Sequence, residues 1–296
     1  MDRRSFIASL ATGIAVAAAG GVGAYAAGRS GFDPVESLLG TLPSPEASPT
    51  MTSSPAPTLL YPNGRPVPTK IPKATEIYGR FAVPRLRKIK LPGGEISELP
   101  GPGRNVALTV DDGASSETIR GYCDFVERTG FRMTFFITSQ YDGWTDNVKQ
   151  MRRLVDSGHL QVANHTTTHK WLTRESDSTV AAQLSGCEKF IKNNFGVTAH
   201  PYFRPPFGEV DSRVARIAAN EGYSTPVLWY GTFGDAGMTS VGGVSNMAKR
   251  WLQPQSIVIG HANFDPVVHA LPFIEQILHR RHLQPVTLDD VYLRQA

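Results

Sequence analysis

The stretch Leu108-Thr-Val-Asp-Asp-Gly113 is an apolar run that ends in two adjacent carboxylates and a glycine. This pattern predicts a buried strand followed by a turn. After it, short apolar runs alternate with amphipathic stretches to the end of the chain. Roughly seven β-then-α units with short connections predict an α/β domain with parallel strands. The predicted strands span residues 106–110, 133–138, 160–163, 202–204, 225–229, 256–259 and 284–287, and the predicted helices span residues 116–128, 147–156, 178–194, 212–221, 244–252 and 267–282.

The side chains best suited to chemistry fall at or just after the ends of these predicted strands. They are Asp111, Asp112, His165, Arg204, Asp235 and His261. A closed or nearly closed barrel and an open doubly wound sheet both fit the alternation of elements. In a barrel the carboxyl ends of all strands converge on one face, whereas an open sheet brings them together less readily. The placement of these residues therefore favours the barrel.

Asp112, His165 and His169 are the candidate metal ligands. If residues 165–169 are helical, the two imidazoles lie on one helix face and can reach one ion. A carboxylate with two histidines can hold a divalent cation and leave a position open for water. The same donor set occurs in non-haem iron oxygenases, so the ligands alone leave both hydrolase and oxygenase chemistry open.

Asp111, Arg204, Phe207 and His261 offer the remaining parts of a hydrolytic site. Asp111 can accept a proton from a water activated by the metal, and Arg204 can pair with Asp111 and keep it ionised. Neither proline of Arg204-Pro-Pro-Phe-Gly208 has an N–H, so the first backbone donor after the arginine is at Phe207, where it can serve an oxyanion. His261 can protonate a leaving group. Taken singly, each of these residues is equally compatible with a structural role.

The N-terminal sequence predicts a targeting segment followed by a linker. Asp2-Arg3-Arg4 precedes an uncharged, Ala/Gly-rich stretch up to Gly28, which is typical of a twin-arginine export signal. Residues 1–28 are therefore expected to be a cleaved signal or a membrane anchor, and either outcome places the rest of the chain outside the cytoplasm. Residues 29–75 are rich in Pro, Ser and Thr and are expected to form a disordered linker. The globular domain is expected to span residues 76–296.

The charge composition argues against one class of binding partner. The net charge of the 296 residues is +4, with a pI near 9.1 and no long basic run, which argues against nucleic acid as a partner. We expect a monomer. Cys123 and Cys187 are the two cysteines, and they are expected to be buried free thiols, although export would permit a disulfide.

In order and spacing, these motifs together resemble the polysaccharide deacetylase family, the chitooligosaccharide-deacetylase-like carbohydrate esterases. The segments Thr134-Phe135-Phe136-Ile137, Ser157-Gly158-His159 and Gly222-Tyr223 agree with the same family. The resemblance covers roughly residues 105–287.

The resemblance implies a distorted (β/α)₇ barrel and a metal-dependent enzyme that removes acetyl groups from a polysaccharide such as peptidoglycan. It implies zinc or another divalent metal as the cofactor. The implied roles are Asp111 as general base, Asp112, His165 and His169 as metal ligands, Arg204 as the residue that orients the base, Phe207 as an oxyanion donor, and His261 as general acid. Phe207, Trp229 and Ile259 are expected to contact the substrate.

The family pattern Trp-x-x-Asp-x-x-Asp-Trp is altered here. Trp229 and Asp235 are kept, whereas Thr232 replaces the first aspartate and Ala236 the last tryptophan. Asp235 can still pair with His261 and raise its pKa, but the acyl pocket loses a wall. This change keeps a second function open, that of a non-catalytic glycan-binding module with the deacetylase fold. The connection from His159 to the Asn-His motif is one residue longer than the family pattern, which predicts a bulge.

Overall fold

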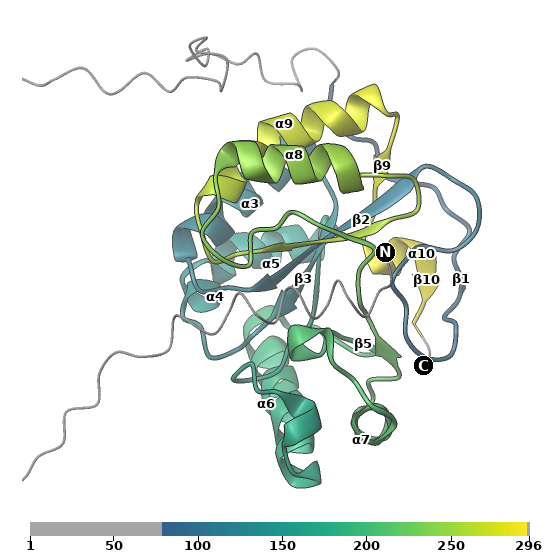
Figure 1. The fold of residues 1–296 in the computed structure, drawn as a ribbon, viewed down its shortest axis with the longest axis vertical. Coiled ribbons are helices and arrows are strands. Elements are labelled where there is room, and N and C mark those ends of the chain that lie inside the picture. The colour runs from purple at the N-terminus through teal and green to yellow at the C-terminus, as the bar shows by residue number, and fades with distance from the viewer. Residues whose placement is uncertain (1–78, 295–296) are drawn as a thin grey trace, which may run out of the picture. The chain divides into compact units, whose positions relative to one another are not determined.

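The computed structural model describes residues 79–294 (Figure 1). The predicted signal or anchor of residues 1–28 and the predicted linker of residues 29–75 lie outside the described residues. Within residues 79–294, no helix is both long enough and apolar enough to cross a membrane.

The centre of the domain is a curled sheet of parallel strands. Neighbouring strands follow the order β6-β5-β4-β3-β2-β8-β7, and β9 pairs with the start of β2. The strands are β2 (Asn105–Asp112), β3 (Met133–Ile137), β4 (Leu160–Asn164), β5 (Tyr202–Phe203), β6 (Thr225–Pro226), β7 (Gly231–Thr232), β8 (Ile257–His261) and β9 (Gln284–Pro285). The predicted α/β barrel with parallel strands is confirmed, as a barrel left open between β6 and β7.

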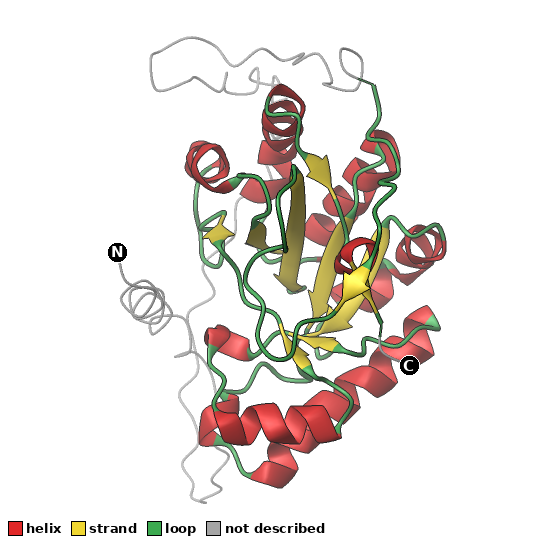
Figure 2. Ribbon diagram, turned by 90° about the vertical axis from the view of Figure 1, so that its right-hand side faces the viewer, coloured by secondary structure: helices red, strands yellow, loops and turns green. Residues whose placement is uncertain are grey.

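Helices surround this sheet, as Figure 2 shows. They are α3 (Ser116–Thr129), α4 (Gly143–Asp146), α5 (Val148–Asp156), α6 (Asp177–Phe195), α7 (Ser212–Asn220), α8 (Val241–Trp251), α9 (Pro266–Arg280) and α10 (Leu288–Val291), with single 3₁₀ turns at Leu172–Arg174 and Pro206–Gly208. Helices α3 and α6 begin and end in the same way. The hydroxyls of Ser115 and Ser176 accept a backbone N–H in the first turns of α3 and α6, and Gly130 and Gly196 close these helices with left-handed backbone.

Two apolar cores follow from a sheet that is covered on both faces. The larger lies between the sheet and the helices and includes Val110 and Phe135. The smaller lies inside the barrel and includes Ala107, Phe136 and Tyr202. Cys123 and Cys187 are buried and free, as expected, and burial raises the pKa of each thiol to about 12.

The strand predicted over residues 225–229 is confirmed only for its first two residues, which form β6 on one edge of the sheet. A further short strand that was not predicted, β7, follows at Gly231–Thr232 and lies on the other edge. Between them the backbone crosses the opening, because the N–H of Val227 bonds Phe203 while that of Tyr230 bonds Ile257. The N–H of Leu228, midway, donates to Ile96 from the lead-in segment.

The predicted bulge before Asn164 is also wrong. Strands β3 and β4 pair in unbroken register from Met133↔Leu160 to Ile137↔Asn164. The segment preceding β2 contains β1 (Ile89–Lys90), which pairs with β10 (Tyr292–Leu293).

Candidate active site

A cavity of about 270 Å³ opens at the carboxyl ends of the strands. All ten site residues predicted from the sequence lie in it or directly support it. Its lining residues are Asp111, Asp112, Tyr141, His165, His169, Pro205, Phe207, Gly208, Trp229, Thr232, Ala236, Ile259, His261 and Asn263. Arg204 and Asp235 support the cavity through the Asp111 and His261 side chains.

The turn after β2 sets the directions of the two aspartates. Asp112 has a left-handed backbone with φ 71°, and Gly113 follows at φ 112°. A Cβ on Gly113 would lie 2.1 Å from the Trp144 ring, so this position requires glycine. The Trp144 indole N–H donates to the backbone carbonyl of Asp112 at 2.8 Å and fixes the turn from behind.

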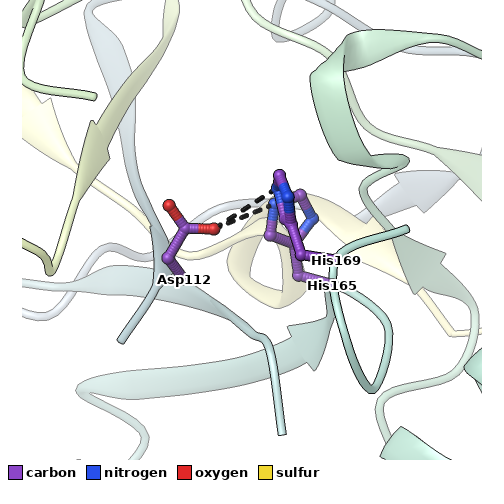
Figure 3. A group of neighbouring side chains, drawn as sticks. All are labelled: Asp112, His165 and His169. Carbon is purple, nitrogen blue, oxygen red and sulfur yellow. Dashed lines mark ion pairs between the residues drawn. The ribbon is translucent and has the colours of Figure 1, made fainter. Parts of the chain in front are cut away.

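Asp112, His165 and His169 form a compact three-donor cluster (Figure 3). The Nε2 atoms of both histidines lie 3.5 Å from Oδ1 of Asp112. That oxygen is buried and has no hydrogen-bond partner within the described residues, while Oδ2 accepts from Asn263 at 2.7 Å. An orphaned carboxylate oxygen facing two imidazole nitrogens fits a divalent cation bound by N and O donors.

The protonation states of the cluster agree with metal binding. Burial and the charge of His165 lower the pKa of His169 to about 4, although Asp112 and Asp111 oppose the shift. Burial by itself raises the pKa of Asp112, but the charges of the three nearby histidines and the Asn263 hydrogen bond outweigh it and lower that pKa. At neutral pH the histidine is thus unprotonated and the carboxylate ionised, as metal ligands must be.

The helical geometry considered for residues 165–169 is wrong. The segment is a loop, and Thr166 and His169 have left-handed backbone with φ of 73° and 54°. Asn164 stabilises the turn by accepting the Thr166 N–H at 2.8 Å. His165 is fixed further by its Nδ1, which lies 2.7 Å from the carbonyl oxygen of Arg204.

Arg204 is fully buried and pairs with Asp111. Its Nη1 lies 2.6 Å from Oδ1 of Asp111 and also donates to the hydroxyl of Thr109. Its Nε and Nη2 donate to the carbonyls of Val227 and Leu228, the residues that cross the barrel opening. One guanidinium therefore orients the carboxylate and ties down the backbone at the open seam.

His261 and Asp235 form a second buried pair. The ring Nδ1 lies 3.0 Å from Oδ1 of Asp235, whose Oδ2 accepts the backbone N–H of His261. Burial alone lowers the pKa of His261, but the hydrogen bond and charge of Asp235, together with Asp112 and Asp111, raise it to about 9.

A family model with the description polysaccharide deacetylase matches residues 98–226. The chain contains a polysaccharide deacetylase domain. The match includes Asp111, Asp112, both histidines of the cluster and Arg204, and it ends before Asp235 and His261.

Curated relatives of the deacetylase domain come from fungi and bacteria. Chitin deacetylase 1 of Cryptococcus neoformans is 36% identical over 129 residues, which are 43% of this chain and 26% of that protein. Peptidoglycan-N-acetylglucosamine deacetylase PgdA of Listeria monocytogenes is 28% identical over 239 residues, 76% of this chain and 48% of the relative. The chain therefore spans half or less of the length of these relatives.

Solved structures share the fold. A family 4 carbohydrate esterase from Streptomyces lividans in complex with acetate is 27% identical, with a TM-score of 0.54 over 61% of this chain and 91% of that chain. A family 4 pseudoenzyme from Bacillus anthracis has a TM-score of 0.60 at 19% identity, covering 68% of this chain and 69% of that chain. The second likeness concerns the fold alone.

Four residues of the deacetylase domain's site escaped the sequence analysis. Asn263 holds Asp112, and its position two residues after His261, at the end of β8, was an available signal. Trp171 stacks on Phe207 at 4.2 Å and donates its indole N–H to Glu209. Tyr141 lines the cavity from a loop that no motif marks.

Proposed function

We propose that the domain is a metal-dependent hydrolase that removes acetyl groups from an N-acetylated polysaccharide outside the cytoplasm. One observation carries the proposal: a single cavity combines the three-donor cluster with the Asp111–Arg204 and Asp235–His261 pairs. Metal, base and acid functions are thereby available within one site.

Asp112, His165 and His169 would hold the metal ion, for which zinc is our proposal because two imidazoles and a carboxylate suit it. When bound, a divalent ion polarises an acyl carbonyl and makes a nearby water more acidic. Asn263 and the carbonyl of Arg204 keep two of the ligands in position.

Asp111 is the proposed general base. Its Oδ1 is occupied by Arg204, so Oδ2 remains to accept a proton from the attacking water. Arg204 stabilises the ionised carboxylate and fixes its plane.

The backbone N–H of Phe207 is the proposed oxyanion donor. Phe207 has left-handed backbone with φ 62°, and within the described residues its N–H has no hydrogen-bond acceptor. A preorganised, unused donor beside the cluster suits the charge that develops on an attacked carbonyl oxygen.

His261 is the proposed general acid. Its Nδ1 faces Asp235, which leaves Nε2 to deliver a proton to the departing nitrogen. The raised pKa keeps this imidazole protonated at neutral pH.

Trp229 and Ile259 form the proposed apolar wall for the substrate, with Thr232 and Ala236 beside them. Peptidoglycan and chitin are the first candidates, because two of the relatives are deacetylases named for these polymers. The predicted export segment of residues 1–28 supports action outside the cytoplasm, on a polymer of the cell wall.

Acetate release tests the proposal. The purified protein is incubated with chitin oligomers, peptidoglycan and acetylxylan, each with and without a chelator. We expect acetate from an N-acetylated substrate, loss of release with the chelator, and recovery when divalent metal is restored. The absence of release from every substrate at full metal loading would contradict it.

The second candidate is a glycan-binding module without catalysis, favoured by Ala236 in the cavity wall. It predicts glycan binding without acetate release, and binding that is unchanged in Asp111→Asn. Acetate release, measured on one protein sample that binds glycan, therefore distinguishes the two candidate functions.

A further inference from the structure

A basic and apolar segment precedes the barrel. Residues 80–90 read Arg-Phe-Ala-Val-Pro-Arg-Leu-Arg-Lys-Ile-Lys and contain five cations and no acidic residue. The proposed reaction uses none of them.

The segment is anchored at both ends, at its beginning by side chains and at its end by the backbone pairing of β1 with β10. The guanidinium of Arg80 donates to the carbonyls of Glu127 and Arg128 at the end of α3, and Phe81 stacks on His279 at 4.2 Å. After these contacts the side chains turn outward. Arg85, Arg87, Lys88 and Lys90 are exposed, and within residues 79–294 none of the four side chains has an ion pair or a hydrogen bond.

Aliphatic side chains accompany these cations. Val83, Leu86 and Ile89 are 61%, 37% and 41% exposed, and Leu293, on the strand paired with β1, is 51% exposed. These are four of the seven large hydrophobic residues that are exposed in the described part of the chain. We call residues 82–90 together with Leu293 the basic arm.

The basic arm lies at the opposite end of the barrel from the cavity. Helix α10, which leads directly into β10, bonds the beginnings of β3 and β4 through Thr134 and Gln161. The cavity lies at the other ends of these same five-residue strands, roughly 13 Å further along them. Figure 1 shows β1 and β10 together on one side, with the arrowheads of β2 and β3 pointing away from them.

We propose that the basic arm is a docking surface for an anionic lipid bilayer. Cations attract anionic headgroups, and the aliphatic side chains between them can enter the boundary between headgroups and acyl chains. A soluble anionic polymer would satisfy the cations but offer no apolar phase to Val83, Leu86 and Ile89. In this orientation the cavity faces away from the membrane. The proposal is independent of the reaction at the cavity.

A position-specific probe tests this in the full chain. Cys123 and Cys187 are buried, so an environment-sensitive fluorophore will label a thiol introduced by Leu86→Cys. The matched control is Met238→Cys, a position that is 86% exposed between β7 and α8, on the cavity side. Vesicles contain phosphatidylcholine alone or phosphatidylcholine with phosphatidylglycerol.

We expect a blue shift of the probe at position 86 with anionic vesicles, reversed by salt, and no shift at position 238. Equal shifts at both positions, an equal shift with neutral vesicles, or no shift at all would overturn the proposal. So would an equal shift with soluble polyphosphate, because the partner would then be a polymer rather than a bilayer.

Charge variants give an independent measure. The arm variant replaces the four exposed cations of the arm with Gln, at Arg85, Arg87, Lys88 and Lys90. The control variant replaces four exposed cations on helices outside the arm with Gln, at Arg120, Lys149, Lys189 and Arg216. Each cation near an anionic bilayer strengthens binding by roughly fivefold. We expect the arm variant to bind anionic vesicles at least about tenfold more weakly and the control variant to bind normally. Equal weakening in both variants would show that net charge alone matters, and would overturn the proposal.

Discussion

At the scale of single residues, the pair of Asp235 and His261 controls where a proton is held. The hydrogen bond and the charge of Asp235 help to raise the pKa of His261 to about 9. In its proposed role as general acid, His261 acts in its protonated form, so we expect activity to fall as the pH rises through this pKa. We predict that Asp235→Asn keeps an acceptor for the ring but lowers the pKa, which moves the alkaline limb of kcat/KM to lower pH by about one to two units.

Asp265→Asn is the matched control for this measurement. Asp265 pairs with His269 at 2.8 Å, but both side chains are more than 60% exposed and lie outside the cavity. This variant should leave the pH profile unchanged. An unmoved alkaline limb in Asp235→Asn would remove Asp235 from its assigned role.

His169 differs from His165 in how its ring is held. Within the described residues, no hydrogen bond fixes the second ring nitrogen of His169, and its side chain is 25% exposed against 3% for His165. The ring instead packs edge-on against Phe207 at 4.8 Å, and Trp171 stacks on Phe207 at 4.2 Å. Aromatic packing therefore takes the place of the hydrogen bond that usually orients a ligand histidine.

We predict that Trp171→Ala weakens metal affinity by about tenfold, because loss of an outer support typically costs 10- to 100-fold. Competition with a chelating dye measures the affinity without any assay of activity. Trp171→Phe should recover most of it by restoring the stack. Phe81→Ala, which removes another stacked ring at 4.2 Å, should leave metal affinity unchanged.

At the scale of the elements, Arg204 closes the seam between β6 and β7. Removing it leaves Asp111 as an unpaired buried carboxylate and the carbonyls of Val227 and Leu228 without their donors. We predict that Arg204→Met lowers the free energy of unfolding by about 3–5 kcal/mol. Urea denaturation with unchanged m-value measures the loss.

The double variant Asp111→Asn with Arg204→Met separates charge from packing. It has no unpaired charge, so its loss of stability should be smaller than that of Arg204→Met alone. A double variant that is equally or more unstable would show that the seam carbonyls, rather than the carboxylate, dominate the cost.

Local geometry was less predictable than element type. Apolar runs and turn residues located β2, β3, β4 and β8, because buried parallel strands leave a strong apolar signal. The chain from Thr225 to Thr232 gave one predicted strand where two edge strands occur, since only tertiary partners decide which edge each half joins. The left-handed turns at Thr166 and His169 likewise depend on Asn164 and on neighbouring loops rather than on local propensity.

At the scale of the whole molecule, the carboxyl ends of the parallel strands converge on one face of the barrel, and this convergence brings the site residues together. Residues as distant in sequence as Asp111 and His261 are neighbours in register on β2 and β8. Their meeting therefore follows from a parallel barrel. No motif marks Thr109 and Glu209, which support the site through contacts that exist only after folding.

The two ends of the domain carry different chemistry. The cavity collects the ionisable residues at the carboxyl ends of the strands, while the basic arm lies at their beginnings. An export segment ahead of such an arm would give two weak membrane contacts, and two are generally needed for stable association.

The assignment of Asp111 as base beside an intact metal cluster is the central claim, and Asp111→Asn tests it most directly. The substitution keeps the size of the side chain and leaves Asp112, His165 and His169 untouched. Acetate release and bound metal are measured on the same samples. We predict unchanged metal content with release reduced by about 100-fold or more. Release at the parental rate with full metal content would contradict the assignment.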